Sequence, residues 1–170
     1  MEPTEVDVVR QVFDAFNEGD LQRAVSSVSP ICEMTDVAAG QTYSGPDGFR
    51  QWLGIFATAF SDGRAELTDV IRDGSRVAVE YIGRGTHDGP FATPAGTIPA
   101  TGRSAELRFA QVVEVHDASI TAVRVYYDGA TLLRQLGLMP SQGSPAERGM
   151  TTLMALGVKA QQQIRQLRHH

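Results

Sequence analysis

The hydrophobic pattern of this chain changes its period at Arg64, and this change constrains the fold more than any other feature. Before Arg64, apolar residues recur every three or four positions, which is typical of amphipathic helices. After it, apolar positions alternate with others, as in Val77, Val79 and Tyr81, which is typical of strands with one buried face. Helices followed by successive strands indicate an α+β domain whose helices pack on one face of a curved antiparallel sheet.

Three helices are expected before the change of period. Thr4 is placed to cap the first helix, which ends at residues 17–19. Asp20 is placed to cap a shorter second helix, and Pro30 ends that helix. Pro46, in a turn-rich stretch, is suited to the first turn of the third helix.

Strands account for most of the remaining domain. A short strand is predicted over residues 31–36, and four successive strands follow from Arg64 onwards. Turn-forming residues separate these strands at 73–74, at 116–119 and in a long Gly- and Pro-rich excursion over 88–102. These connections favour antiparallel pairing.

The chain beyond the strands divides into two parts. Residues 132–138 are typical of a short helix that Asp128 is placed to cap, and they complete a domain over residues 1–139. Residues 140–170 form a polar linker and a further helix, which begins at a capping box over 144–147. The apolar stripe of this helix predicts that it docks on the sheet, docks on a second subunit or covers a pocket as a lid.

Composition excludes several classes of function. The chain has 15 Lys and Arg against 20 Asp and Glu and a pI near 5.3, whereas nucleic-acid-binding domains have a pI above about 9. No apolar run reaches the roughly 18 residues of a membrane span, and no signal-peptide pattern is present. We therefore expect a cytoplasmic protein without nucleic-acid or membrane partners. One cysteine, Cys32, excludes an internal disulfide and a multi-thiolate metal site, and no metal site is predicted.

Four local strings carry a resemblance to a known family. They are AFNEGDL at 15–21, GTHDG at 85–89, PATGR at 99–103 and LLRQLGL at 132–138. In this order they resemble the SnoaL-like polyketide cyclases, which belong to the group related to nuclear transport factor 2. The resemblance implies a cone-shaped α+β barrel, in which a curved antiparallel sheet with three packed N-terminal helices wraps an apolar pocket. It also implies a homodimer and no cofactor.

The same alignment places non-ionisable residues where these cyclases carry catalytic groups. Aligned on Asp128 and the string at 132–138, the family's catalytic aspartate falls at Val125, and its strand histidine falls at Gln111. Valine cannot transfer protons. The resemblance therefore implies the scaffold without the usual aspartate-driven aldol closure. Limonene-type epoxide hydrolases also carry an aspartate at this position, so their chemistry loses support too.

Asp36 and His87 are the predicted acid–base pair. Related ketosteroid isomerases and scytalone dehydratases place a pocket carboxylate near the position of Asp36, where apolar neighbours would raise its pKa. His87 shares the strand parity of Val77 and Val79, so its imidazole is expected to face the same side. The structural alternatives are an Asx turn for Asp36 and a hydrogen-bonded turn residue for His87.

Gln111 and Tyr127 are predicted to polarise a carbonyl or hydroxyl group of the substrate. Gln111 interrupts an apolar strand face, where an unsatisfied amide would cost about 1–3 kcal/mol. It therefore either donates to a developing oxyanion or bonds a buried backbone group. Tyr127 shares its parity with Val125, so its phenol is expected to donate in the same pocket.

Apolar and aromatic residues are predicted to form the wall that binds a flat, largely hydrophobic ligand. They are Tyr43, Trp52, Phe56, Tyr81, Phe91, Phe109 and Val125.

We therefore expect an enzyme that acts on an apolar, polyketide-like small molecule by cofactor-free acid/base catalysis: cyclisation, isomerisation or dehydration. Two alternatives share the fold: a non-catalytic dimeric binding protein and a cofactor-independent oxygenase. The sequence does not indicate the substrate or the pathway.

Overall fold

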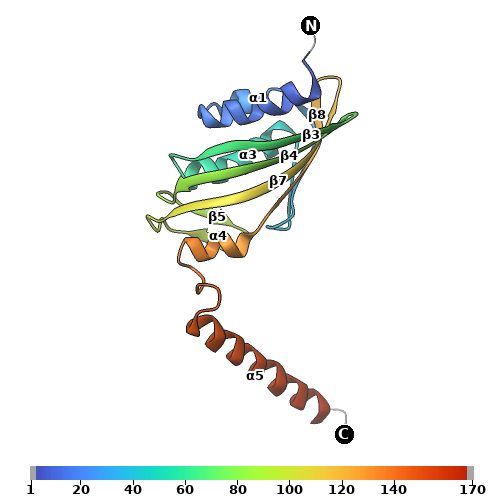
Figure 1. Cartoon of the computed structure of the whole chain (residues 1–170). Helices are drawn as coiled ribbons and strands as arrows, with labels where there is room; N and C mark the ends of the chain where they lie inside the picture. Colours follow the sequence, from blue (N-terminus) through green and yellow to red (C-terminus); the bar gives the residue numbers. More distant parts are fainter. Residues whose placement is uncertain (1–2, 168–170) are drawn as a thin grey trace.

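The computed structural model of the chain describes residues 3–167, and side chains through residue 162. In chain order the elements are α1 (Glu5–Asn17), α2 (Leu21–Ala24), β1 (Val28–Asp36), β2 (Gln41–Ser44), α3 (Gly45–Ala59), β3 (Arg64–Asp73), β4 (Arg76–Thr86), β5 (Phe91–Thr93), β6 (Gly96–Ile98), β7 (Ser104–His116), β8 (Ser119–Tyr127), α4 (Gly129–Gln135) and α5 (Pro145–Leu167). The predicted α+β architecture, with N-terminal helices, a curved sheet and a C-terminal helix, is confirmed (Figure 1).

One six-stranded sheet, in the order β2-β1-β8-β7-β4-β3, forms the body of the domain. Neighbouring strands in this sheet pair antiparallel, except for β1 and β8, which run parallel and place Asp36 beside Val125. The expectation of purely antiparallel pairing is wrong at this one junction. The strands β1 and β8 are far apart in the chain, so no hairpin turn dictates their relative direction.

Two local predictions also need correction. The second helix ends at Ala24, and Val28, predicted to lie on it, instead begins β1. The excursion over 88–102 contains a small hairpin of β5 and β6 that was not predicted. Both elements are too short for hydrophobic periodicity to reveal them.

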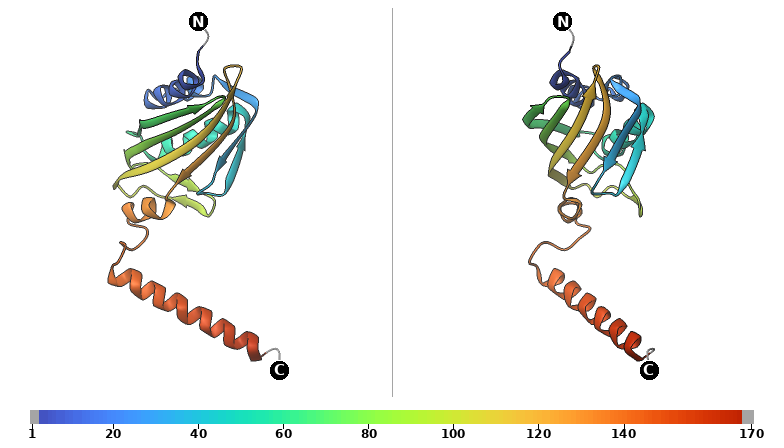
Figure 2. Two further views of the ribbon diagram at one scale, coloured as in Figure 1. Left: turned by 45° about the vertical axis from the view of Figure 1, so that its right-hand side comes forward. Right: turned by 90° about the vertical axis from the view of Figure 1, so that its right-hand side faces the viewer.

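The helices α1 and α3 cover one face of the sheet (Figure 2). A capping box begins α1 as predicted, because Thr4 Oγ1 accepts from the N–H of Asp7 and the Asp7 carboxylate accepts from the N–H of Thr4. Alternate residues of β7 point towards these helices and are buried, and Gln111 is one of them. The inner face of the sheet and the two helices therefore enclose the core.

The last two helices lie at one end of the domain. Asp128 caps α4 through the N–H of Thr131, 3.0 Å away, as predicted. The first turn of α5 is tied to α4 by an ion pair between Arg134 and Glu147, at 3.1 Å. Beyond it, α5 extends away from the domain (Figures 1 and 2). Over its described residues, α5 neither docks on the sheet nor covers a pocket, and docking on a second subunit stays a prediction.

Within residues 3–167, no helix is long and apolar enough to cross a membrane.

Candidate functional site

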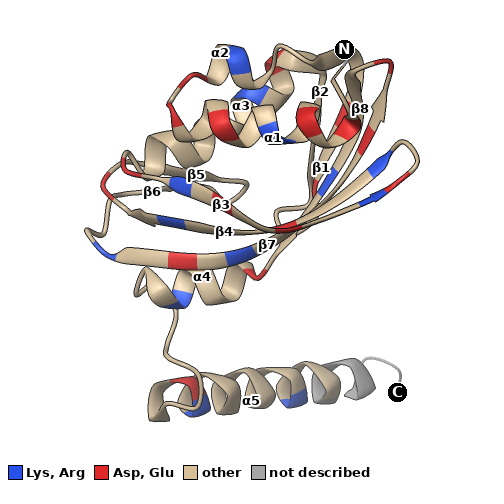
Figure 3. Ribbon diagram, turned by 45° about the horizontal axis from the view of Figure 1, so that its top comes forward, with Lys and Arg blue, Asp and Glu red and all other residues tan. Residues whose placement is uncertain are grey.

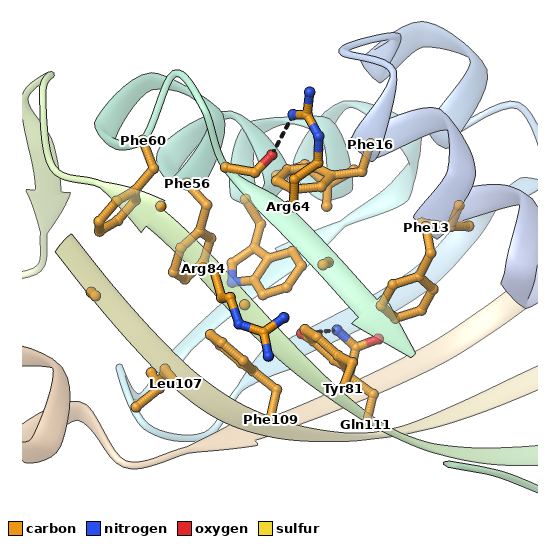
Figure 4. Close-up of a pocket in the computed structure, with 18 of the residues that line it drawn as sticks. Phe13, Phe16, Phe56, Phe60, Arg64, Tyr81, Arg84, Leu107, Phe109 and Gln111 are labelled. Atoms are coloured by element: carbon orange, nitrogen blue, oxygen red, sulfur yellow. Dashed lines mark hydrogen bonds between the residues drawn. The ribbon is translucent and has the colours of Figure 1, made fainter. Parts of the chain in front are cut away.

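A cavity lies between α1, α3 and the inner face of the sheet, and aromatic side chains line most of it (Figure 4). Its volume is about 90 Å³, whereas pockets that hold drug-sized ligands measure roughly 300–1,000 Å³. The cavity is therefore smaller than the pockets that hold ligands of that size. The aromatic lining residues are Phe13, Phe16, Phe49, Trp52, Phe56, Phe60, Tyr81 and Phe109.

Tyr81 and Gln111 form a hydrogen-bonded pair in this lining. Gln111 Nε2 donates to the phenol oxygen of Tyr81, 2.8 Å away (Figure 4). The strand register explains the contact: Gln111 lies directly opposite Val79, so Tyr81 is its diagonal neighbour. Because its oxygen accepts this bond, the phenol keeps its own hydrogen to donate to a ligand. Burial raises the pKa of Tyr81, so the phenol stays protonated at neutral pH.

Neighbouring aromatic rings hold Tyr81 in place. Its ring stacks on Phe109, with centroids 4.8 Å apart and planes at 4°, and meets the edge of Phe13 at 4.9 Å. Phe109 lies over Gly83, where a Cβ atom would come within 2.9 Å of the ring. The absence of a side chain at Gly83 therefore allows the stacked arrangement.

Arg64 and Arg84 lie on the solvent side of the cavity. The Arg84 guanidinium on β4 bonds Glu66 on β3 and Glu106 on β7, at 2.6 and 2.7 Å, across three neighbouring strands. Both carboxylates are largely exposed, so the arrangement adds little to stability. It places an arginine engaged with two carboxylates beside the opening of an otherwise apolar cavity.

Asp36 is the centre of a second polar group, which stands behind the cavity wall. Its Oδ2 accepts from Trp52 Nε1 and from the phenol of Tyr127, both 3.0 Å away, and its Oδ1 accepts from the N–H of Ala39 at 2.9 Å. Asp36 is 3% exposed. The burial of Tyr127, together with the negative charge of Asp36, raises the pKa of the Tyr127 phenol. Trp52 lines the cavity, whereas Asp36 and Tyr127 do not. Asp36 therefore orients a wall residue.

His87 lies apart from both the Tyr81–Gln111 pair and the Asp36 group. Its ring packs against Phe60 and Phe91, with centroids 5.4 and 6.2 Å away. Its Nδ1 accepts from the N–H of Thr101 at 3.3 Å and lies 3.0 Å from Thr101 Oγ1. A neutral ring with Nδ1 as acceptor carries its proton on Nε2. In the described part of the chain, Nε2 is buried without a hydrogen-bond partner.

The predicted pairing of Asp36 with His87 is not formed in the structure, because each side chain is held by its own partners and neither lines the cavity. Gln111 does line the cavity, but its partner is Tyr81, whereas Tyr127 bonds Asp36. The four predicted catalytic residues thus fall into three separate groups. Tyr81 was predicted only as a wall residue, and its phenol is the polar group that bonds Gln111 in the cavity.

The predicted wall is present in part. Trp52, Phe56, Tyr81 and Phe109 line the cavity, whereas Tyr43, Phe91 and Val125 do not. Phe91 packs behind the wall, with its ring centroid 6.0 Å from that of Phe56. Tyr43 lies on the edge strand β2. Phe13 and Phe16 on α1 also line the cavity and were not predicted as wall residues; their helical spacing with the other apolar residues of α1 was the available signal.

Val125 lies between two of the predicted catalytic residues in the sheet. It pairs with Asp36 on one side and with Gln111 on the other, and it is fully buried. An apolar side chain therefore separates the Asp36 group from the Gln111 pair on the inner face. In residues 3–167, no group of three or more His, Cys, Asp or Glu side chains is arranged to hold a metal ion.

Comparison with known families identifies the class of protein. Residues 6–136 match the SnoaL-like polyketide cyclase family, so the chain belongs to this family. No curated protein sequence matches the chain.

Solved structures share the same fold. AclR from Streptomyces galilaeus, a proposed hydroxylase, is 19% identical with a TM-score of 0.69, over 80% of this chain and 97% of that one. IdmH from Streptomyces antibioticus, a proposed polyketide cyclase, is 25% identical with a TM-score of 0.66, over 79% and 99%. A proposed cyclase from Pseudomonas putida KT2440 is 24% identical with a TM-score of 0.64, over 79% and 98%. Each is covered almost completely, so about a fifth of this chain is additional to the shared fold.

Proposed function

We propose that the protein is an enzyme that binds an apolar, polyketide-like small molecule in the cavity and accelerates a reaction at its carbonyl group without a cofactor. The hydrogen-bonded pair of Tyr81 and Gln111 in an apolar, aromatic cavity carries this proposal. A buried phenol whose oxygen already accepts a bond is a strong donor for a ligand oxygen. Family membership supports an enzyme of the cyclase or isomerase type.

Cyclisation, isomerisation and dehydration next to a carbonyl share one intermediate, the enolate. A proton leaves the carbon beside the carbonyl, and negative charge collects on the carbonyl oxygen. Tyr81 donates to that oxygen while Gln111 holds the phenol, and the apolar surroundings strengthen the hydrogen bond. The lining described here contains no carboxylate or imidazole. Water or a group of the substrate itself accepts the proton, and the methylene between two carbonyls of a polyketide is acidic enough for this.

The test is exchange of α-protons for deuterium in D₂O, followed by NMR, with flat one-ring aryl β-diketones as probes. The wild-type protein is expected to accelerate exchange in a saturable manner. Tyr81→Phe removes the donor but keeps the ring, and it is expected to lower the rate by about 10²-fold or more, as for other oxyanion donors. Tyr43→Phe removes a phenol outside the cavity and serves as the matched control. Equal rates for both variants would show that the cavity pair does not act on the carbonyl.

A second candidate function is non-catalytic binding of the same class of ligand. Val125, buried between the two polar groups, favours it, because the position that carries the family's aspartate cannot move a proton. Calorimetric titration with the same diketones separates the two functions. Saturable binding that depends on Tyr81, without any acceleration of exchange, would indicate a binding protein.

A further inference from the structure

A carbonyl group in the cavity meets one polar pair and otherwise apolar surface. The phenol of Tyr81 accepts from Gln111 and keeps its own hydrogen for a ligand. Phe109 stacks on the Tyr81 ring at a centroid distance of 4.8 Å. The indole N–H of Trp52, which also lines the cavity, already donates to Asp36 at 3.0 Å. Apart from the Tyr81–Gln111 pair, a ligand at this end of the cavity is therefore surrounded by apolar and aromatic groups.

The cations of the described lining, Arg64 and Arg84, lie away from this pair. Arg84 has the opposite strand parity to Tyr81 and lies three residues further along β4, roughly 10 Å at about 3.3 Å per residue. Charged residues of both signs lie on β3, β4 and β7 (Figure 3), and two glutamates among them bond Arg84. Arg64 pairs with Arg84 in the strand register, is exposed, and forms no ion pair within residues 3–162. Arg64 is therefore the cation that an anionic ligand can reach at the opening.

The enolate that Tyr81 is placed to stabilise can form without any proton acceptor in the cavity. When a β-keto carboxylate loses carbon dioxide, the bond between its α-carbon and its carboxyl carbon breaks. The electron pair of that bond moves to the carbonyl oxygen, which becomes the enolate oxygen. Water then gives a proton to the α-carbon, and the hydroxide left behind combines with carbon dioxide as bicarbonate. The described lining, which contains no carboxylate or imidazole, meets the needs of this route.

The surroundings of Tyr81 also favour the movement of charge in this route. In the ground state the negative charge is on the carboxylate, to which aromatic and aliphatic side chains offer no hydrogen bond. In the transition state the charge moves to the carbonyl oxygen, to which the phenol donates. A donor fixed in advance by Gln111 therefore stabilises the transition state more than the ground state.

We propose that the cavity decarboxylates aryl β-keto acids, an inference that rests on the proposed function because it uses the same donor and the same enolate. Arg64 attracts the carboxylate to the opening, and Tyr81 binds the ketone oxygen. The carboxylate, two bonds from that ketone carbon, then lies among aromatic side chains. Contact of the aryl group with the aromatic lining supplies the binding free energy that offsets the loss of water around the carboxylate.

Decarboxylation of benzoylacetate, a one-ring β-keto acid, tests the activity at about pH 8, where the probe is ionised. NMR follows the acetophenone that forms. The wild-type protein is expected to exceed the spontaneous rate in a saturable manner. Tyr81→Phe keeps the stacked ring and is expected to lower kcat by about 10²-fold or more. Tyr43→Phe, which removes a phenol outside the cavity, is the matched control and is expected to react as the wild type does.

A second measurement needs no variant. Benzoylacetone has the same aryl ketone and no carboxylate, and it is one of the aryl β-diketones that test the proposed function. It is expected to inhibit the decarboxylation competitively, because both compounds bind the same donor. Inhibition that is absent or non-competitive would place the decarboxylation at another site and overturn the inference.

Arg64→Gln tests how the carboxylate is recognised. It is expected to raise KM for benzoylacetate roughly fivefold, which is the contribution of an exposed ion pair, with a smaller change in kcat. Because Arg64 is exposed, the effect should fade as salt is added. An equal weakening of the binding of neutral benzoylacetone would show that Arg64 does not recognise the charge.

The two probes separate failure of this inference from failure of the proposed function. Acceleration of α-proton exchange in benzoylacetone, without faster decarboxylation of benzoylacetate, would overturn the inference and leave the proposed function standing. If neither probe reacts faster than in buffer, both fail. Decarboxylation that is as fast in Tyr81→Phe as in the control would also overturn the inference, because the phenol would then have no part in the reaction.

Discussion

Replacing Asp36 with alanine tests whether this carboxylate holds the cavity wall. The change leaves two side-chain donors, Trp52 Nε1 and the phenol of Tyr127, without the acceptor that each now meets at 3.0 Å. Each buried donor without a partner costs about 1–3 kcal/mol, so the two together cost about 2–6 kcal/mol. Domains of this kind have a total stability of about 5–15 kcal/mol, so the loss is a large fraction of it.

Thermal and urea unfolding measure this loss. At about 2–4 °C per kcal/mol for a chain of this size, Asp36→Ala is expected to lower the melting temperature by roughly 10 °C. Tyr127→Phe removes one donor and leaves Asp36 with two other partners, so it is expected to cost only about 0.5–1.5 kcal/mol. The double variant no longer contains the orphaned phenol. It should therefore be more stable than the two single losses predict, with a coupling of about 0.5–3 kcal/mol.

Two results would refute this reasoning: a melting temperature for Asp36→Ala within about 2 °C of the wild type, or purely additive losses in the double variant. Asp36→Asn supplies a separate readout, because it keeps the volume of the side chain. If it abolished α-proton exchange while the protein melted normally, Asp36 would be a proton carrier, as its sequence position suggested, and its contact with Trp52 would be secondary.

Three further outcomes are expected. The N–H of Thr86 donates to Asp62 and lowers the pKa of that carboxyl below its ordinary 3.8. The ionised carboxylate therefore stabilises the fold above pH 3.8, and this stabilisation is lost as the pH falls through the lowered pKa. Asp62→Asn should flatten the acid limb of a curve of unfolding free energy against pH. Burial raises the pKa of Cys32 to about 11, so a thiol reagent at pH 8 should react with it only as fast as the protein unfolds. Gly83→Ala should cost about 1–3 kcal/mol in urea unfolding by displacing the ring that lies over it, whereas Gly54→Ala, which has open space inside α3, should be neutral or stabilising.

The architecture of the domain follows from local signals in the sequence. The change of period at Arg64 predicted helices before strands, and Thr4, Asp20 and Asp128 each cap the helix that they were expected to cap. The alternation along β7 predicted that Gln111 points inwards, and it does. These features depend on neighbours a few residues away, and hydrophobic periodicity and capping chemistry report such neighbours directly.

The pairing of the polar side chains could not be predicted in the same way. The contact between Tyr81 and Gln111 depends on the register of β4 against β7, and the excursion over 88–102 is too long for its turn type to set that register. The contact between Asp36 and Tyr127 depends on the parallel pairing of β1 with β8, which no local pattern signals. Parity placed each residue on a face, and only the register decides which residues on that face meet.

The parallel junction of β1 with β8 also sets the order in which the domain can be completed during synthesis. The strands β3, β4 and β7 can pair with their neighbours as they leave the ribosome, and β1 can pair with β2, but the other edge of β1 has to wait for the last strand. The hydrogen bond from Tyr127 to Asp36 spans 91 residues, and contacts of such separation slow folding. A nascent chain that ends before β8 therefore leaves one edge of β1 without its partner strand, and the carboxylate behind the cavity wall acquires its phenol partner only when the domain is nearly complete.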